Sequence, residues 1–126
     1  FREGFRPFAP AILEEYAKEY FEFPDDEHVF FMEKVYQFKD KYQKKFPAIV
    51  HYDGTGRLQS VNKKINPRFY RLIESFNELT GVPIVVNTSF NLNGEPIVES
   101  PIDAIKTFYV CGLDYLVIGN YLISKS

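Results

Sequence analysis

The pattern of apolar and polar residues marks one helix at both ends and along one face. Asn66 followed by Pro67 is typical of a helix start, because asparagine caps free backbone amides and proline suits the first helical position. Gly81 is typical of a helix end. Apolar residues between them recur at helical spacing and predict a packing face made of Phe69, Leu72, Ile73, Phe76 and Leu79.

Two further helices are predicted from similar signals. Ser100, Pro101 and Asp103 form a second start signal, and Gly112 follows as a stop. The face expected to be buried in this helix consists of Ile102, Ile105, Phe108 and Tyr109. Another helix is expected to start at Pro10 and to stop at residues 23–26, because apolar residues recur at Leu13, Tyr16, Ala17, Tyr20 and Phe21.

Runs of β-branched and aromatic residues predict strands. These runs are residues 29–37, 48–52, 57–61, 84–86, 115–118 and 121–124. Glycine-containing turns at 53–56 and 119–120 are expected to close two hairpins. The lysine-rich residues 38–45 indicate a solvated helix or an insertion. This mixed order predicts a single α+β domain over residues 1–126, with a twisted mixed sheet and flanking helices.

The stretch 82–101 places small polar side chains directly after a short apolar strand. Asn87, Ser89 and Asn91 offer hydrogen-bond donors and acceptors without bulk. Strand ends are where α/β and α+β domains commonly bind ligands. The same residue types also build ordinary turns, so a ligand site and a structural turn are both open for this stretch.

A polar face is expected on the predicted hairpin at residues 48–61. Because side chains alternate along strands, His51, Asp53, Arg57 and Gln59 would line one side. Such a set suits anion binding, and it equally suits an ordinary hairpin whose polar residues face solvent.

Two arginines near the start of the chain, Arg2 and Arg6, lie in a proline-containing segment that is not expected to be helical. Guanidinium groups are planar and permanently charged, so the pair suits binding of a phosphate or a carboxylate. Two solvated surface arginines are the alternative.

Composition narrows the classes of function. The 126 residues carry a net charge of −2 and a pI near 5.7, which gives no overall reason to expect nucleic acid or an anionic membrane as a partner. The single cysteine, Cys111, excludes an intrachain disulfide and indicates a buried thiol in the reducing cytoplasm. The acidic residues 25–27 beside His28 are expected to be solvated, and no metal site is predicted. Because the chain begins with Phe1, we expect it to be a segment of a longer protein.

Four phrases along the chain together resemble one family. They are REGFRPFAP at 2–10, HYDGTGRLQSV at 51–61, NTSFN at 87–91, and GEPIV at 94–98 with SPIDA at 100–104. In this order and spacing they are similar to the C-terminal domain of the nodulation-type and antibiotic-tailoring O-carbamoyltransferases. The resemblance covers essentially the whole chain.

The resemblance implies a YrdC-like fold and a reaction in two steps. The family's C-terminal domain forms carbamoyl-adenylate from carbamoyl phosphate and ATP, with release of phosphate and pyrophosphate, and magnesium is the expected companion of ATP. An actin-like ATPase-type N-terminal domain then passes the carbamoyl group to a hydroxyl of a sugar-containing acceptor. That domain, where the family binds iron and the acceptor, is not part of residues 1–126 and is the expected partner within the same protein.

The resemblance also implies roles for the arginines. Arg6 and Arg57 would hold the phosphate or carbamate of carbamoyl phosphate, and Arg2 would be an additional anion contact. The reaction brings two anions together, so fixed cations suit it and no protein nucleophile is required. In the family a lysine just before this segment contributes to nucleotide binding, so the segment alone is expected to bind ligand weakly.

Polar residues receive roles in the same way. The residues that would contact the nucleotide phosphates or the ribose are Asn87, Ser89 and Asn91. The expected supporting residues are His51, Asp53 and Gln59. For His51, a general base and a hydrogen-bonded histidine of the hairpin are both open.

Two functions of other classes remain open. Some YrdC-like proteins bind double-stranded RNA, although the acidic pI argues against that function here. The residues that would form the RNA footprint are Lys39, Lys41, Lys44, Lys45, Lys63, Lys64, Arg68 and Arg71. The other function is that of a non-catalytic interaction domain that only caps its partner domain.

Overall fold

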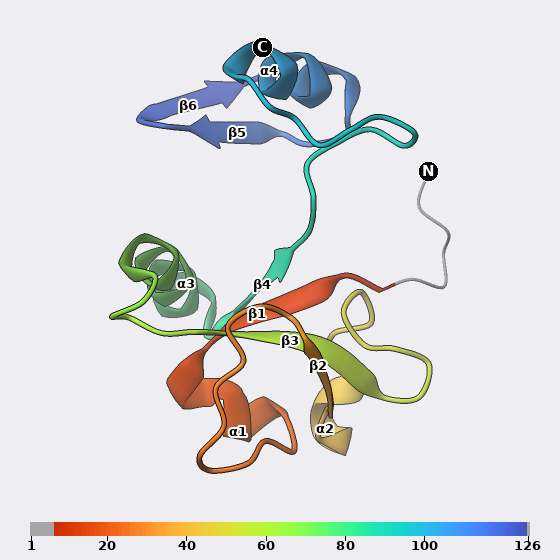
Figure 1. The fold of residues 1–126 in the computed structure, drawn as a ribbon, viewed down its shortest axis with the longest axis vertical. Coiled ribbons are helices and arrows are strands. Elements are labelled where there is room, and N and C mark those ends of the chain that lie inside the picture. The colour runs from red at the N-terminus through yellow and green to blue at the C-terminus, as the bar shows by residue number, and fades with distance from the viewer. Residues whose placement is uncertain (1–6, 126) are drawn as a thin grey trace. The chain divides into compact units, whose positions relative to one another are not determined.

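The computed structural model describes residues 7–125, which fall into two compact units divided after residue 88 (Figure 1). Residues 7–88 form a mixed sheet with helices, and residues 89–125 form a helix with a two-stranded sheet. This arrangement confirms the predicted α+β class. No helix among residues 7–125 is long and apolar enough to cross a membrane.

The larger unit is built on a four-stranded sheet in the order β2-β3-β1-β4. Its strands are β1 (Ala9–Leu13), β2 (Lys34–Gln37), β3 (Thr55–Val61) and β4 (Ile84–Asn87). Strand β1 runs parallel to β3 and antiparallel to β4, and β2 runs antiparallel to β3. Because β1 is a central strand, all five of its residues are buried.

The helix predicted from Pro10 is wrong at its start, since residues 9–13 form β1. A short apolar run that is buried on both faces looks the same in a strand and in a helix. Only the neighbours β3 and β4, far away in sequence, decide between them. Helical structure begins afterwards with a 3-10 turn at Glu14–Tyr16 and continues as α1 (Ala17–Tyr20).

Each face of the sheet packs against its own apolar cluster. One face meets a core rich in aromatic rings, in which Phe21 and Phe38 are fully buried with ring centroids 4.0 Å apart. The sheet residues in this core are Ile12, Tyr36, Leu58 and Ile84. The opposite face meets α3 (Pro67–Thr80), and the residues of that core are Ala11, Leu13, Val61, Tyr70 and Ile73.

Helix α3 confirms the strongest prediction of the sequence. The Asn66 side chain accepts a hydrogen bond from the backbone amide of Phe69, and Gly81 ends the helix in the left-handed conformation with φ 73°. The predicted packing face is only partly correct. Ile73 is buried, whereas Leu72, Phe76 and Leu79 are exposed.

The hairpin predicted over residues 48–61 is wrong. Residues 48–52 form no strand, and β3 pairs with β2 and β1 instead. A local loop precedes β3, in which the His51 amide donates to the carbonyl of Thr55 at 2.7 Å.

Two other segments before β3 are less regular than expected. The strand predicted at 29–37 is confined to β2, because the Val29 amide bonds to Ser60 Oγ at 3.0 Å and Met32 adopts a positive φ of 51°. The lysine-rich segment contains one helical turn, α2 (Asp40–Gln43).

The smaller unit contains α4 (Pro101–Val110), β5 (Tyr115–Ile118) and β6 (Tyr121–Ser124), as the sequence predicts. Strands β5 and β6 form an antiparallel pair. Ser100 Oγ caps α4 by accepting a hydrogen bond from the Asp103 amide at 3.1 Å.

The buried face of α4 differs from the expected one. Ile102 and Tyr109 are exposed, and the buried residues of the helix are Ala104, Thr107 and Phe108. Cys111 is half-buried rather than buried, and its Sγ lies 3.3 Å from the carbonyl oxygen of Phe108.

Candidate functional site

The sheet face that packs against α3 also carries polar residues. They lie outside the region of that face that forms the apolar core with α3. Gln59 of β3 is paired with Ala11 of β1, and Asn87 of β4 is paired with Ala9. Paired residues of neighbouring strands point to the same side, and side chains alternate along each strand. Arg57, Gln59 and Asn87 therefore share one face, and we call these three residues the open face.

A hydrogen bond joins β3 to β4 across the strand between them, β1. Asn87 Nδ2 donates to Gln59 Oε1 at 2.5 Å. The methyl side chains of Ala9 and Ala11 lie between these residues and leave room for the two amides to meet. Gln59 Nε2 in turn donates to the carbonyl oxygen of Phe30 at 2.9 Å. Gln59 is thus held at both ends, and it fixes Asn87 relative to β3.

Arg57 supplies the charge of the open face. It lies two residues before Gln59 on β3 and is paired with Val35 of the edge strand β2. Arg57 is exposed and makes no ion pair with any of residues 7–125. An unpaired guanidinium beside two amides is suited to phosphate or carboxylate oxygens. The arrangement is compatible with the anion-binding alternative left open by the sequence.

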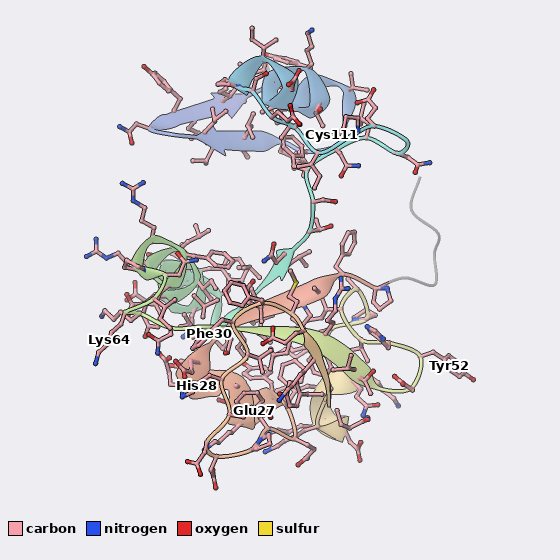
Figure 2. The ribbon with its side chains drawn as sticks, viewed as in Figure 1. Glu27, His28, Phe30, Tyr52, Lys64 and Cys111 are labelled. Carbon is pink, nitrogen blue, oxygen red and sulfur yellow. The ribbon has the colours of Figure 1, made fainter. Side chains whose placement is uncertain are left out.

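His51 and Asp53 lie in the loop before β3, so strand alternation does not place them on the open face. Asp53 Oδ1 accepts hydrogen bonds from the hydroxyl of Thr55 at 2.7 Å and from its amide at 3.0 Å. These bonds, the one from the hydroxyl above all, hold the pKa of Asp53 below its ordinary value. Tyr52 projects from the same loop into solvent (Figure 2). The structure gives Asp53 the role of shaping the turn.

The remaining predicted site residues are not joined to the open face by any described contact. Arg2 and Arg6 lie outside the described residues. Ser89 and Asn91 belong to the smaller unit, where Ser89 is exposed. Asn91 Nδ2 donates to the carbonyl of Glu95 at 3.0 Å and so closes a local loop.

A cavity of about 260 Å³ lies beside Gln59, and it was not predicted from the sequence. Its lining includes Phe30 and Phe31 from the segment before β2, and Asn62, Ile65 and Asn66 from the turn after β3, and we call these two segments its walls. These residues come from segments about thirty positions apart, so no local pattern connects them. The pair of phenylalanines before β2 and the asparagines after β3 were the only available signals.

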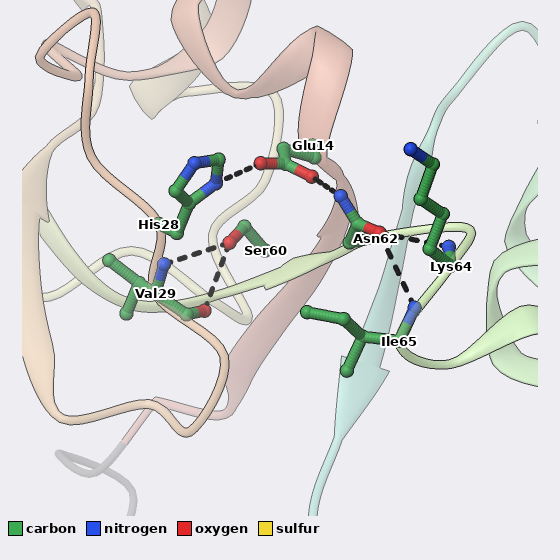
Figure 3. A network of polar contacts seen from close by, with 7 residues as sticks. All are labelled: Glu14, His28, Val29, Ser60, Asn62, Lys64 and Ile65. Atoms are coloured by element: carbon green, nitrogen blue, oxygen red, sulfur yellow. Dashed lines mark hydrogen bonds and ion pairs between the residues drawn. The ribbon is translucent and has the colours of Figure 1, made fainter.

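A polar network holds the two walls of this cavity together (Figure 3). One carboxylate oxygen of Glu14 contacts Nδ1 of His28, and the other accepts a hydrogen bond from Asn62 Nδ2. Asn62 Oδ1 accepts from the Lys64 amide at 2.8 Å and from the Ile65 amide at 3.4 Å. Glu14 therefore ties the segment that carries Phe30 and Phe31 to the turn that carries Ile65.

Within residues 7–125, no group of three or more histidine, cysteine, aspartate and glutamate side chains could hold a metal ion. The acidic stretch 25–27 is used in surface ion pairs, in which Asp25 pairs with Lys18 and Glu27 with Lys34. These pairs are the first cause of the lowered pKa of each carboxylate.

Comparison with known proteins shows what the chain is related to. The family model described as carbamoyltransferase C-terminus matches residues 1–125. The chain is 50% identical to nodulation protein NolNO of Sinorhizobium fredii and 48% identical to nodulation protein NolO of Bradyrhizobium diazoefficiens. It is also 43% identical to an uncharacterised protein of Methanocaldococcus jannaschii.

Each of these alignments covers 98% of the chain but only a small part of the relative, namely 18%, 23% and 20% of its length. The similarity therefore concerns one part of much longer proteins. A family match over nearly the whole chain, together with half-identical relatives, establishes the relationship. The chain belongs to the carbamoyltransferase C-terminus family.

Proposed function

We propose that this chain is the part of a carbamoyltransferase that forms carbamoyl-adenylate from carbamoyl phosphate and ATP. The activated carbamoyl group would then be transferred to a hydroxyl of a sugar-containing acceptor by another part of the same protein. The observation that carries the proposal is the open face, where Arg57, which makes no ion pair within residues 7–125, lies beside the hydrogen-bonded amides of Gln59 and Asn87.

The proposed reaction brings together two anionic reactants. Water releases phosphate from carbamoyl phosphate, an oxygen of the resulting carbamate attacks the α-phosphorus of ATP, and pyrophosphate leaves. Fixed positive charge lowers the repulsion between the attacking carbamate and the phosphates. Arg57 would supply such charge from β3, and Arg6 and Arg2 would add to it.

The polar residues would orient the nucleotide. Asn87 is already held by Gln59, so its position is fixed before a ligand arrives. Ser89 and Asn91 would contact the nucleotide phosphates or the ribose. The open face contributes no carboxylate, so magnesium would be bound chiefly by the phosphates of ATP and by water, and it would neutralise part of their charge.

The test measures pyrophosphate release in the intact protein that contains this chain. Arg57→Ala is compared with Arg71→Ala, which removes the same charge from an exposed position on α3. A hydrogen bond to a charged group contributes about 1.5–3 kcal/mol, so release dependent on carbamoyl phosphate should fall about 10- to 100-fold for Arg57→Ala. Arg71→Ala should leave it unchanged.

Two results would count against the proposal. If the unaltered intact protein releases no pyrophosphate in the presence of carbamoyl phosphate, the reaction is wrong. If Arg57→Ala retains full release with an unchanged circular dichroism spectrum, the reaction stands but the assignment of Arg57 is wrong.

A further inference from the structure

We propose that the cavity lined by residues 30–31, 59–62 and 65–66 binds the planar base of the nucleotide. This inference rests on the proposed function, because it concerns the same ligand. It adds a recognition site formed, apart from Gln59, by residues that the family resemblance did not assign.

Aromatic and aliphatic side chains that line this cavity are exposed to solvent. Phe31 is 81% exposed and Ile65 is 59% exposed, and both line the cavity. Phe30, on the same wall as Phe31, stacks against the ring of His28 with centroids 5.6 Å apart. Exposed rings beside a cavity offer flat apolar surfaces, and base stacking on aromatic side chains is a general way to bind nucleotides.

The size of the cavity favours a base over a whole nucleotide. Its volume of about 260 Å³ is below the roughly 300–1,000 Å³ that pockets for drug-sized molecules have. A ring system fits such a space, whereas the ribose and the charged phosphates would have to lie outside it. The amides of Asn62 and Asn66 also line the cavity and suit the polar edge of a base.

The cavity is continuous with the open face through Gln59, which belongs to both. Arg57 lies two residues along β3, a separation of roughly 7 Å at the rise of a strand. A ribose spans a gap of this order between a base and its phosphates. One nucleotide can therefore place its base between Phe31 and Ile65 and its phosphates near Arg57.

The segments that carry the lining residues are held together before binding. Glu14 contacts His28, which lies just before Phe30 and Phe31, and accepts a hydrogen bond from the lining residue Asn62, as Figure 3 shows. Ser60 Oγ accepts from the Val29 amide and donates to the Val29 carbonyl at 3.1 Å, which fastens the phenylalanine segment to β3. Such a preorganised cavity suits a flat, rigid ligand, because few protein groups have to lose conformational freedom when the ligand binds.

The test compares two probes in the intact protein, ATP and inorganic triphosphate. Phe31→Ala removes the exposed ring, and Leu79→Ala serves as control because it removes an apolar side chain that is 86% exposed on α3. We expect Phe31→Ala to weaken ATP binding about 5- to 100-fold, the range that one stacking contact gives, and to leave triphosphate binding unchanged. The control should change neither.

The outcomes separate this inference from the proposed function. If the unaltered protein binds ATP and Phe31→Ala binds it equally well, the base site is overturned while the proposed function stands. Equal weakening of ATP and triphosphate by Phe31→Ala also overturns the base site, because the base is then not what the ring contacts. If the unaltered protein does not bind ATP, the proposed function and the base site both fail.

Discussion

The hydrogen bond between Gln59 and Asn87 should make the effects of mutating them strongly non-additive. Gln59→Ala removes two hydrogen bonds, one from Asn87 at 2.5 Å and one to the carbonyl of Phe30 at 2.9 Å. Asn87→Ala removes only the first. The double variant loses the same two bonds as Gln59→Ala alone, because the shared bond can be lost only once.

The size of each effect follows from this count. A hydrogen bond inside a protein contributes about 0.5–1.5 kcal/mol net to stability. Gln59→Ala should therefore lower the free energy of unfolding by about 1–3 kcal/mol and Asn87→Ala by about 0.5–1.5 kcal/mol. The double variant should match Gln59→Ala, so its loss should be smaller than the sum of the single losses by about 1 kcal/mol.

Urea unfolding followed by the near-ultraviolet signal of tyrosine measures these differences. The chain has nine tyrosines and no tryptophan, and Tyr20, Tyr36 and Tyr70 are buried in the unit that contains the Gln59–Asn87 hydrogen bond. Asn93→Ala, an exposed asparagine of the other unit, is the matched control. Single losses that add to the double loss within about 0.3 kcal/mol would refute a direct bond across β1.

Two further properties of the larger unit can be tested in the same way. Gly56→Ala should lower the free energy of unfolding by about 1–3 kcal/mol, because the new Cβ would lie 2.5 Å from the buried ring of Phe38. In Gly112→Ala the new Cβ would have no neighbour within 4 Å, so the free energy of unfolding should change by less than about 0.5 kcal/mol. Equal effects of the two glycine variants would contradict the packing around β3. The hydrogen bond to the Glu15 carboxylate, and then burial, raise the pKa of Tyr70 from 10.0 to about 12. Because this pKa is higher in the folded state, the contribution of the Tyr70 hydroxyl to the free energy of unfolding is complete below pH 10 and is lost as the pH rises towards 12. The free energy of unfolding of the unaltered protein should therefore exceed that of Tyr70→Phe by less and less across this interval. A constant difference would contradict the hydrogen bond between Tyr70 and Glu15.

The elements that the sequence predicted correctly are those with local signals. Helices α3 and α4 are marked by their own caps, Asn66 and Ser100, and the structure shows both side chains accepting the expected amide hydrogen bonds. Strands β5 and β6 are joined by a glycine-containing turn of two residues. In each case residues a few positions apart in the sequence decide the structure.

The errors occur where distant partners decide the structure. Residues 10–13 were expected to begin a helix because apolar residues recur at helical spacing from Leu13 onward, yet pairing with β3 and β4 makes residues 9–13 a central strand. Residues 48–52 have strand-like composition, yet β3 takes β2 as its antiparallel neighbour. These pairings could not be identified from one sequence, because the partner strands are separated from each other by many residues along the chain.

The candidate site was predictable only in part for the same reason. Alternation along one strand correctly places Arg57 and Gln59 on one face. Their meeting with Asn87 depends on the two alanines of β1, in a strand that the sequence did not predict. The cavity beside Gln59 depends on two loops that only the folded sheet brings together.

The most direct test of the account is the binding of carbamoyl phosphate and ATP to the intact protein, measured by calorimetry. The account predicts that Arg57→Ala weakens binding about 10- to 100-fold while the protein remains folded, and that the control Arg71→Ala binds normally. Unchanged binding in folded Arg57→Ala would contradict the claim that the open face of β3 and β4 is the anion site.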